Sequence, residues 1–281
     1  MGTDTTSIHK VFRDPVMNEE LSREGFVIVD FLSPDEVIAL TSVFYTEEDS
    51  RRDPFTTFAS GDYDYRVKTD AAIKSVFARR FAEIFDGYLP FWGNFFIKKP
   101  QSPAMPVHAD LQYVDEPGHI SVNIWCPLVD TGADNGTLGL VPYSHRLVRP
   151  IRGTNVTDGY RLHAGAIGRA FGRLVDFRAG QAVIYDHRVL HYSSANDSDR
   201  LRLAATLVAV PESVPLIHYY AETEGATTID KYVISDVDDL LRTGFLQRPA
   251  HLVPHETIRQ HIFTPLTVGD FEVLYQAVNA G

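Results

Sequence analysis

The feature that most constrains the fold is a succession of short β-rich segments through the middle of the chain, from Pro90 to Tyr220. Turn signals such as residues 132–136 and Ala179-Gly180 separate these segments, and no long helical pattern lies between them. Such a succession is typical of an antiparallel sandwich or jelly roll. The predicted strands are residues 91–98, 119–128, 137–141, 173–177, 181–185, 189–194, 201–210 and 216–220.

The segments on either side of this region carry helical patterns. Ser33, Pro34 and Glu36 supply an N-cap, a first-turn proline and a capping box, which predict a helix over residues 34–44 after a short strand at 25–30. Further helices are predicted at 70–88, 235–242 and 268–280. We therefore expect a mainly β fold with flanking helices, in a single domain. Its parts are N-terminal helices at 20–90, a jelly-roll core at about 90–220 and a C-terminal appendage at 221–281, within residues 1–281.

Charge and cysteine content exclude several classes of protein. The chain has 26 Lys+Arg against 37 Asp+Glu, a formal net charge of −11, whereas a protein that binds nucleic acid by charge needs a basic face. The single cysteine, Cys126, rules out a disulfide framework and a multi-cysteine metal site. No apolar run reaches the roughly 20 residues that span a bilayer, and the polar N-terminus lacks a signal-peptide core. We expect a cytoplasmic monomer or homodimer that binds neither nucleic acid nor membrane.

The most informative chemical residues are His108, Asp110 and, far downstream, His191. In an extended segment residues i and i+2 point to the same face, so His108 and Asp110 can converge on one point. A third ligand from a later strand would complete a set of two histidines and one carboxylate, which leaves three positions of an octahedral iron open. Nitrogen and oxygen ligands without thiolate suit non-haem Fe(II), with zinc and manganese as alternatives. Arg202, on a neighbouring antiparallel strand, could return close to His191 and hold a carboxylate bidentately.

Five blocks of the sequence follow one another in a recognisable order. They are His-Ala-Asp-Leu-Gln-Tyr at 108–113, Val-Asn-Ile-Trp-Cys-Pro-Leu at 122–128, Asn-Gly-Thr-Leu-Gly-Leu-Val-Pro-Tyr-Ser-His-Arg at 135–146, Ala-Gly-Gln at 179–181, and a block at 191–202 that begins with histidine and ends with arginine. In this order and spacing the chain resembles the phytanoyl-CoA dioxygenase family of Fe(II)/2-oxoglutarate-dependent oxygenases. The resemblance covers roughly residues 20–212.

This resemblance implies a double-stranded β-helix of the cupin type and a specific site. Arg202, with Ser193 beside it, would bind the distal carboxylate of 2-oxoglutarate. The implied site residues are the iron ligands His108, Asp110 and His191 and the co-substrate contacts Arg202, Ser193, Trp125 and Asn123. The implied reaction uses O2, releases succinate and CO2, and hydroxylates an unactivated C–H bond of a small organic substrate.

Several residues compete with, or depart from, the family pattern. His187 and Arg200 are rivals of His191 and Arg202, and the spacing of the family selects the latter two. His145 is interpreted as a structural hydrogen-bonding residue. Three departures remove no ligand: Tyr143 and Tyr192 replace glycines of the family pattern, and Gln181 replaces an aspartate. The two tyrosines would either reshape the pocket or face solvent.

The substrate is only weakly constrained. Residues 145–173 hold six arginines and one acid, Asp158, which could attract an anionic or carrier-bound substrate or merely pair with acids elsewhere. The aromatic segment 53–67 could form a lid or pack as an ordinary loop. The same iron site could also give desaturation, epimerisation or cyclisation. A hypothesis of another class is a cupin-type metal-binding protein without 2-oxoglutarate, which Arg202 with Ser193 argues against.

Overall fold

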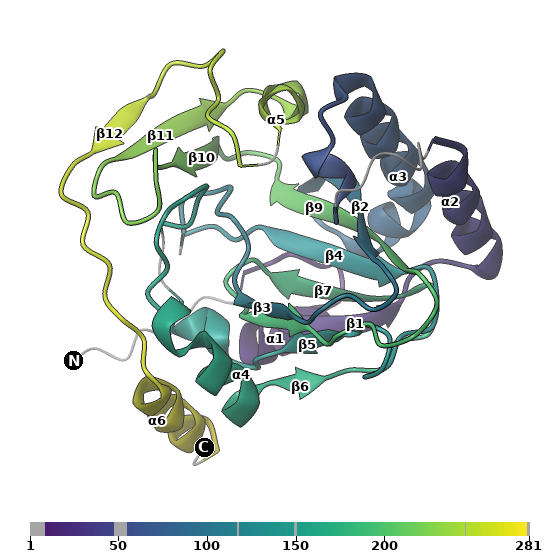
Figure 1. Cartoon of the computed structure of the whole chain (residues 1–281), viewed down its shortest axis with the longest axis horizontal. Helices are drawn as coiled ribbons and strands as arrows, with labels where there is room; N and C mark the ends of the chain where they lie inside the picture. The colour runs from purple at the N-terminus through teal and green to yellow at the C-terminus, as the bar shows by residue number, and fades with distance from the viewer. Residues whose placement is uncertain (1–8, 48–54, 117, 149–150, 245, 280–281) are drawn as a thin grey trace.

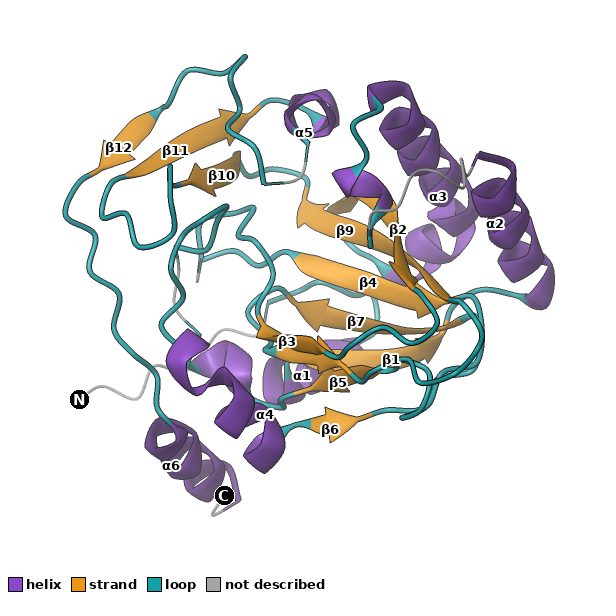
Figure 2. Cartoon of the chain, in the orientation of Figure 1, coloured by secondary structure: helices purple, strands orange, loops and turns teal. Residues whose placement is uncertain are grey.

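The computed structural model describes residues 9–47, 55–116, 118–148, 151–244 and 246–279. Two antiparallel sheets form the centre of the molecule, helices flank them, and a third, smaller sheet lies beside them (Figures 1 and 2). The predicted class, mainly β with flanking helices around a jelly-roll core, is confirmed.

The larger sheet has five strands in the order β1-β7-β4-β9-β2. These are β1 (Phe26–Asp30), β7 (Gln181–Asp186), β4 (Val122–Pro127), β9 (Arg202–Pro211) and β2 (Tyr88–Lys98). All neighbouring pairs are antiparallel. The edge strand β1 precedes the predicted core in the sequence, yet it pairs with β7 along its whole length.

Alternation along β4 and β9 gives this sheet two different faces. Ile124 and Cys126 pack with the flanking helices, whereas Trp125 belongs to the cluster between the two sheets. Because alternate side chains of a strand point to opposite faces, Asn123 and Arg202 also face the interior between the sheets. The polar residues of the predicted site are therefore inward-facing members of otherwise apolar strands.

The smaller sheet faces this interior from the other side. It has four strands in the order β3-β8-β5-β6, namely β3 (Met105–His108), β8 (His191–Ser193), β5 (Leu138–Leu140) and β6 (Arg173–Leu174). Strand β3 was not predicted, and β6 and β8 are shorter than the predicted 173–177 and 189–194. Leu138, Leu140 and Trp125 share one buried cluster, which closes the space between the sheets.

The N-terminal helices are α1 (Pro15–Glu24), α2 (Pro34–Glu47) and α3 (Tyr63–Ile84). The predicted capping box of α2 is present: the Ser33 amide donates to Glu36 at 2.7 Å, and the Glu36 amide donates to the Ser33 hydroxyl at 3.3 Å. The prediction of a helix at 70–88 was wrong at both ends. Asp62 caps α3, which begins seven residues earlier than predicted, at Tyr63. At the other end a turn at Gly87, with φ of 67°, leads directly into β2.

The segment 53–67 is accordingly not one loop. Residues 53 and 54 lie outside the described residues, Thr57–Ala59 form a 3₁₀ helix, and the part from Tyr63 is helical. Phe58 packs against Trp92 with the two rings tilted and their centroids 4.7 Å apart, and both are buried. These contacts favour ordinary packing over a lid for most of the segment.

The C-terminal part forms a sheet of its own, β10-β11-β12, made of β10 (Leu216–Tyr220), β11 (Ile229–Ile234) and β12 (Glu256–Ile258). The predicted helices are confirmed as α5 (Val237–Thr243) and α6 (Val268–Asn279), while α4 (Ala164–Phe171) was not predicted. From β12 the chain runs along the edge of the molecule to α6, which packs on α4 (Figure 1). None of the helices within the described ranges is both long and apolar enough to cross a bilayer.

Candidate metal centre and anion pocket

The two sheets bring three potential metal ligands together. His108, at the end of β3, is the direct cross-strand partner of His191, at the start of β8. One ligand atom each from His108, Asp110 and His191 lies within 4.8 Å of the other two. Asp110 follows β3 by two residues, as the spacing of the His-Ala-Asp segment requires. The structure therefore assembles the predicted set of two histidines and one carboxylate.

Hydrogen bonds to the backbone fix the orientation of both imidazoles. Nδ1 of His108 lies 2.8 Å from the carbonyl oxygen of Pro106, and Nδ1 of His191 lies 3.0 Å from that of Val189. A carbonyl oxygen only accepts, so each Nδ1 carries the proton and each Nε2 keeps its lone pair. This is the tautomer that binds a metal through Nε2. Nε2 of His191 lies 3.5 Å from the hydroxyl of Tyr185.

The two oxygens of Asp110 have different surroundings. Oδ1 lies 3.6 Å from Nε2 of His191, so it faces the ligand cluster. Oδ2 accepts hydrogen bonds from Nδ2 of Asn123 at 3.1 Å and from the hydroxyl of Tyr185 at 3.0 Å. These two donors hold the carboxylate in one orientation with Oδ1 toward the histidines. Oδ1 of Asn123 has no partner among the described groups, and its contact with a co-substrate stays a prediction.

Electrostatics keep the cluster ready to bind a cation at neutral pH. The pKa of His108 is lowered to about 4, and burial is the largest cause. The neighbouring His191 also lowers this pKa, by more than Asp110 raises it. Burial by itself raises the pKa of Asp110, but His191, His187 and His108 outweigh that effect and hold it at about 2. Asp110 is therefore ionised and His108 neutral near pH 7, which is the ligand state that metal binding requires.

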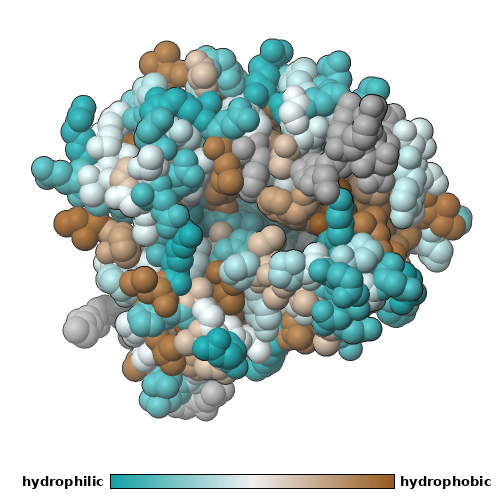
Figure 3. Space-filling view, viewed as in Figure 1, coloured by the Kyte–Doolittle hydropathy of each residue, from teal (hydrophilic) through white to brown (hydrophobic). Residues whose placement is uncertain are grey.

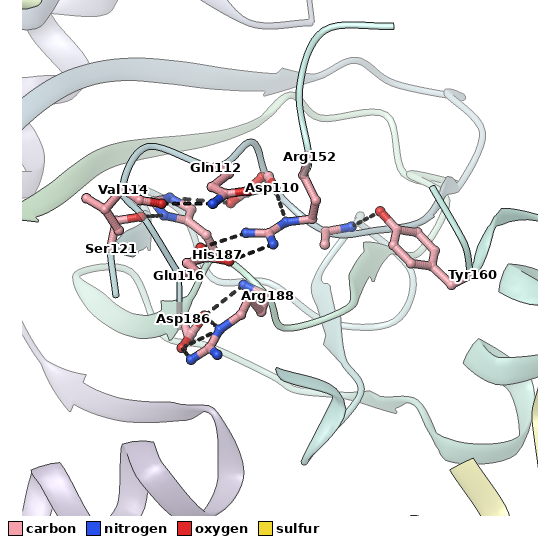
Figure 4. A network of polar contacts seen from close by, with 11 residues as sticks. Asp110, Gln112, Val114, Glu116, Ser121, Arg152, Tyr160, Asp186, His187 and Arg188 are labelled. Atoms are coloured by element: carbon pink, nitrogen blue, oxygen red, sulfur yellow. Dashed lines mark hydrogen bonds and ion pairs between the residues drawn. The ribbon is translucent and has the colours of Figure 1, made fainter. Parts of the chain in front are cut away.

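A buried ion pair supports the loop that carries Asp110. Arg152 forms a bidentate salt bridge with Glu116, with N–O distances of 2.8 and 2.9 Å, and both side chains are almost fully buried. Nε of Arg152 also donates to the backbone oxygen of Asp110 at 2.9 Å, and the amide of Asp110 donates to the carbonyl of His187 at 3.1 Å. Figure 4 shows Arg152 between Asp110 and Glu116, with Tyr160 on its other side. Tyr160 accepts a hydrogen bond from the amide of Ala109 at 2.9 Å.

The rival residues have other positions. Nδ1 of His187 is 2.7 Å from the Ser121 hydroxyl, and its Nε2 lies 3.9 Å from Oδ2 of Asp110, on the side away from the cluster. His145 is buried with Nε2 3.1 Å from the backbone oxygen of Ser22 in α1. Arg200 is exposed, whereas Arg202 is 6% exposed and faces the interior.

Arg202 and Ser193 line a cavity of about 350 Å³. The guanidinium carbon of Arg202 lies 5.6 Å from the centre of the Trp125 ring, so two predicted residues line this cavity and Trp125 lies against one of them. Lys98, at the end of β2, also lines this cavity and donates to the Ser193 hydroxyl at 2.9 Å. Sequence reasoning missed Lys98, because its place depends on the register between β2 and β9.

The donor set fits iron and 2-oxoglutarate. Two imidazole nitrogens and one carboxylate oxygen suit Fe(II) and leave coordination positions for other ligands. Nε of Arg202 is buried without a hydrogen-bond partner among the described groups, which is the state of a guanidinium built to receive a carboxylate. On the face seen in Figure 3 the surface is hollowed near the middle, over the part of the sheet where Figure 1 places β4 and β7.

The departures from the family pattern have clear structural settings. Tyr143 adopts the left-handed conformation with φ of 65°, where the family has glycine, and its ring packs edge-on against Tyr275 of α6 at 5.2 Å. Tyr192 lies against Gly139 and Gly172, where an added Cβ would overlap its ring. Since His191 and Ser193 face the interior, Tyr192 between them points to the outer face of the sheet. Neither tyrosine contacts the ligand cluster.

Comparisons with solved structures identify the fold. The epimerase SnoN, crystallised in complex with Fe3+, alpha ketoglutarate and nogalamycin RO, is 21% identical with a TM-score of 0.51, over 72% of this chain and 87% of that one. EctD from S. alaskensis in its apo form is 18% identical with a TM-score of 0.50, over 76% of this chain and 85% of that one. No curated protein sequence matches the chain significantly.

The jelly roll and its His-Asp-His cluster define the class of iron- and 2-oxoglutarate-dependent enzymes. Within this class, a family model described as Phytanoyl-CoA dioxygenase (PhyH) matches residues 21–204. The chain belongs to this family, which confirms the resemblance seen in the sequence. The iron and 2-oxoglutarate expected as cofactors are likewise those of the class.

Proposed function

We propose that this enzyme is a dioxygenase that hydroxylates an unactivated C–H bond of a small organic substrate, with release of succinate and CO2. The observation that carries the proposal is that one interior holds both the ligand cluster of His108, Asp110 and His191 and the guanidinium of Arg202. A metal at the first and a carboxylate at the second would place a dicarboxylic 2-oxo acid between them.

The residues of the chain have distinct parts in this proposal. His108, Asp110 and His191 would hold Fe(II), which together with 2-oxoglutarate and O2 supplies the oxidising chemistry when bound. Asn123 and Tyr185 keep Oδ1 of Asp110 toward the metal by binding Oδ2. The alternative of a cupin-type metal-binding protein without 2-oxoglutarate is not supported, because the buried Arg202 would have no function in such a protein.

Arg202 and Ser193 would bind the distal carboxylate of 2-oxoglutarate and so fix the position of its reactive end. Trp125 closes this part of the interior: it is 4% exposed, lies over Arg202, and meets Phe177 edge-on at 5.3 Å. A closed apolar wall excludes water, which strengthens the contact between guanidinium and carboxylate and limits side reactions of the oxidant.

The arginine-rich segment 145–173 does not define the charge of the substrate. Of the six arginines of residues 145–173, Arg152 is buried in its pair with Glu116, and Arg161 pairs with Glu224. Arg149 lies outside the described residues. Since acids already neutralise two of these arginines, the segment gives little support for an anionic or carrier-bound substrate. Desaturation, epimerisation and cyclisation remain alternative outcomes of the same site, because they depend on how the substrate is placed.

The test is an anaerobic titration of the protein with Fe(II) and then 2-oxoglutarate. Chelation of the metal by the 2-oxo acid gives a weak visible absorption band, which we expect in the wild-type protein. Arg202→Ala should require far more 2-oxoglutarate to give the same band. A wild-type protein that binds Fe(II) but gives no band at saturating 2-oxoglutarate contradicts the proposal. Product analysis with candidate substrates then separates hydroxylation from its alternatives.

A further inference from the structure

Two buried cations lie side by side on neighbouring strands of the larger sheet. Lys98 of β2 and Arg202 of β9 are direct partners in the antiparallel register, and their residues are 7% and 6% exposed. Like charges opposite each other in a sheet destabilise it, and a buried charge without a partner costs more than an exposed one. An arrangement of this kind calls for an explanation beyond folding.

Nothing in the described part of the chain neutralises this pair. Neither Lys98 nor Arg202 forms an ion pair with a described carboxylate. Lys98 donates to the hydroxyl of Ser193, and Nη1 of Arg202 makes a long contact of 3.4 Å with the backbone oxygen of Phe96. Nε of Arg202 has no hydrogen-bond partner among the residues that the structure describes. The two positive charges therefore face a cavity that they line together, and the missing partner is an anion.

The polar groups around this cavity are arranged for one carboxylate. Lys98 and Arg202 approach from adjacent strands of one sheet, and Ser193 approaches from the other sheet. Because the Ser193 oxygen accepts from Lys98, its own proton can be donated to a ligand. The remaining lining is largely apolar, with Phe55, Phe96 and Met105 among its residues.

We propose that Lys98 is a second cationic ligand of the distal carboxylate of 2-oxoglutarate, acting with Arg202 to select dicarboxylic over monocarboxylic 2-oxo acids. This inference rests on the proposed function and extends it to a residue that the sequence motifs do not include. The stem of Lys98 lies over Gly136, where an added Cβ would come within 2.4 Å of its Cδ, so the ammonium group has a defined position.

The proposed contact makes co-substrate binding depend on pH. Burial, and then the charge of Arg202, lowers the pKa of Lys98 to about 8, whereas burial lowers that of Arg202 only to about 10. The other groups around Lys98 are the hydroxyl of Ser193 and the neighbouring Lys99, and no described acid faces it. Above pH 8 Lys98 loses its proton and its attraction for a carboxylate, so affinity falls as pH rises. If only the protonated form contributes, the dissociation constant rises about tenfold from pH 7 to pH 9.

The experiment compares two 2-oxo acids of equal chain length by calorimetry on the Mn(II)-loaded full-length protein. 2-Oxoglutarate carries the distal carboxylate and 2-oxopentanoate lacks it. We expect Lys98→Met to weaken 2-oxoglutarate binding about 10- to 100-fold and to leave 2-oxopentanoate binding unchanged. The variant should also lose the pH dependence between 7 and 9. Lys10→Met removes the same charge from an exposed surface residue and should bind both acids like the wild type.

Thermal unfolding without a 2-oxo acid provides a second readout. Methionine keeps an aliphatic side chain over Gly136 and removes the uncompensated charge, so Lys98→Met should melt higher than the wild type, by about 2–4 °C. A purely structural lysine would give a lower melting temperature. The inference is overturned if Lys98→Met binds 2-oxoglutarate like the wild type, or if it loses both acids equally. If the wild-type protein binds neither acid, the proposed function fails and the inference falls with it.

Discussion

His108 and His191 are cross-strand partners, and the centres of their imidazole rings lie 4.2 Å apart. Each ring donates Nδ1–H to the carbonyl two residues before it, so both Nε2 atoms keep a lone pair, and that of His191 lies 3.5 Å from the hydroxyl of Tyr185. The antiparallel register brings the two histidines together, just as the i and i+2 spacing brings His108 and Asp110 to the same face. A candidate metal centre results from one short strand pair and the residues next to it.

The first prediction separates His191 from its rival His187. Nε2 of His191 belongs to the ligand cluster, whereas Nε2 of His187 lies 3.9 Å from Oδ2 of Asp110, the oxygen that points away from that cluster. His191→Ala should raise the dissociation constant for Fe(II) or Mn(II) by at least about 100-fold, while His187→Asn should change it by less than about tenfold. Metal titration under anaerobic conditions measures both. Equal losses in the two variants would mean that His187 also coordinates the metal.

The second prediction concerns Tyr185, whose hydroxyl donates to Oδ2 of Asp110 at 3.0 Å. Tyr185→Phe removes that donor and leaves Asn123 as the remaining donor to this oxygen from a side chain. Because partners of a ligand typically change metal affinity 10- to 100-fold, we expect a weakening of about tenfold. The ring and its packing are kept, so the melting temperature should change little. An unchanged metal affinity would show that Asn123 alone orients the carboxylate.

The third prediction tests the ion pair between Arg152 and Glu116. Glu116→Gln removes the charge that pairs with the buried guanidinium of Arg152, so the free energy of unfolding should fall by about 3–5 kcal/mol. Since Arg152 also binds the backbone oxygen of Asp110, metal affinity should fall as well. Urea denaturation measures the first effect and metal titration the second. Glu83→Gln, which breaks two exposed pairs on α3 with Arg79 and Arg80, is the matched control and should leave both unchanged.

The sequence alone could predict the ligand cluster but not its surroundings. His108, Asp110 and His191 were predictable because local spacing and family blocks place them, even though strand β3 was missed. Lys98 could not be predicted, because it is a site residue only through its register with Arg202. The same holds for Tyr185, which no motif singles out and which reaches Asp110 across the interior.

The ends of elements were predicted less well than their existence, for physical reasons that particular residues show. The helical pattern at 70–88 continues apolar spacing past Ile84, yet the chain turns at Gly87 and Tyr88 begins β2. Upstream, the aromatic residues before Asp70 suggested a loop, whereas the side chain of Asp62 caps the helix by accepting from the amide of Tyr65. Tertiary packing and capping decided both ends.

The last prediction concerns Tyr143, which has φ of 65° at a position where the family pattern has glycine. A non-glycine residue in this conformation costs about 1–2 kcal/mol, which the chain offsets by packing the ring against Tyr275 of α6. Tyr143→Ala loses the ring and keeps the strain, whereas Tyr143→Gly loses both. We therefore expect Tyr143→Gly to unfold with a free energy about 1 kcal/mol higher than that of Tyr143→Ala, and both below the wild type. Urea denaturation of the three proteins measures the order. Metal affinity should be equal in all three, because Tyr143 makes no contact with the ligand cluster; a loss in either variant would mean that the docking of α6 supports the metal centre.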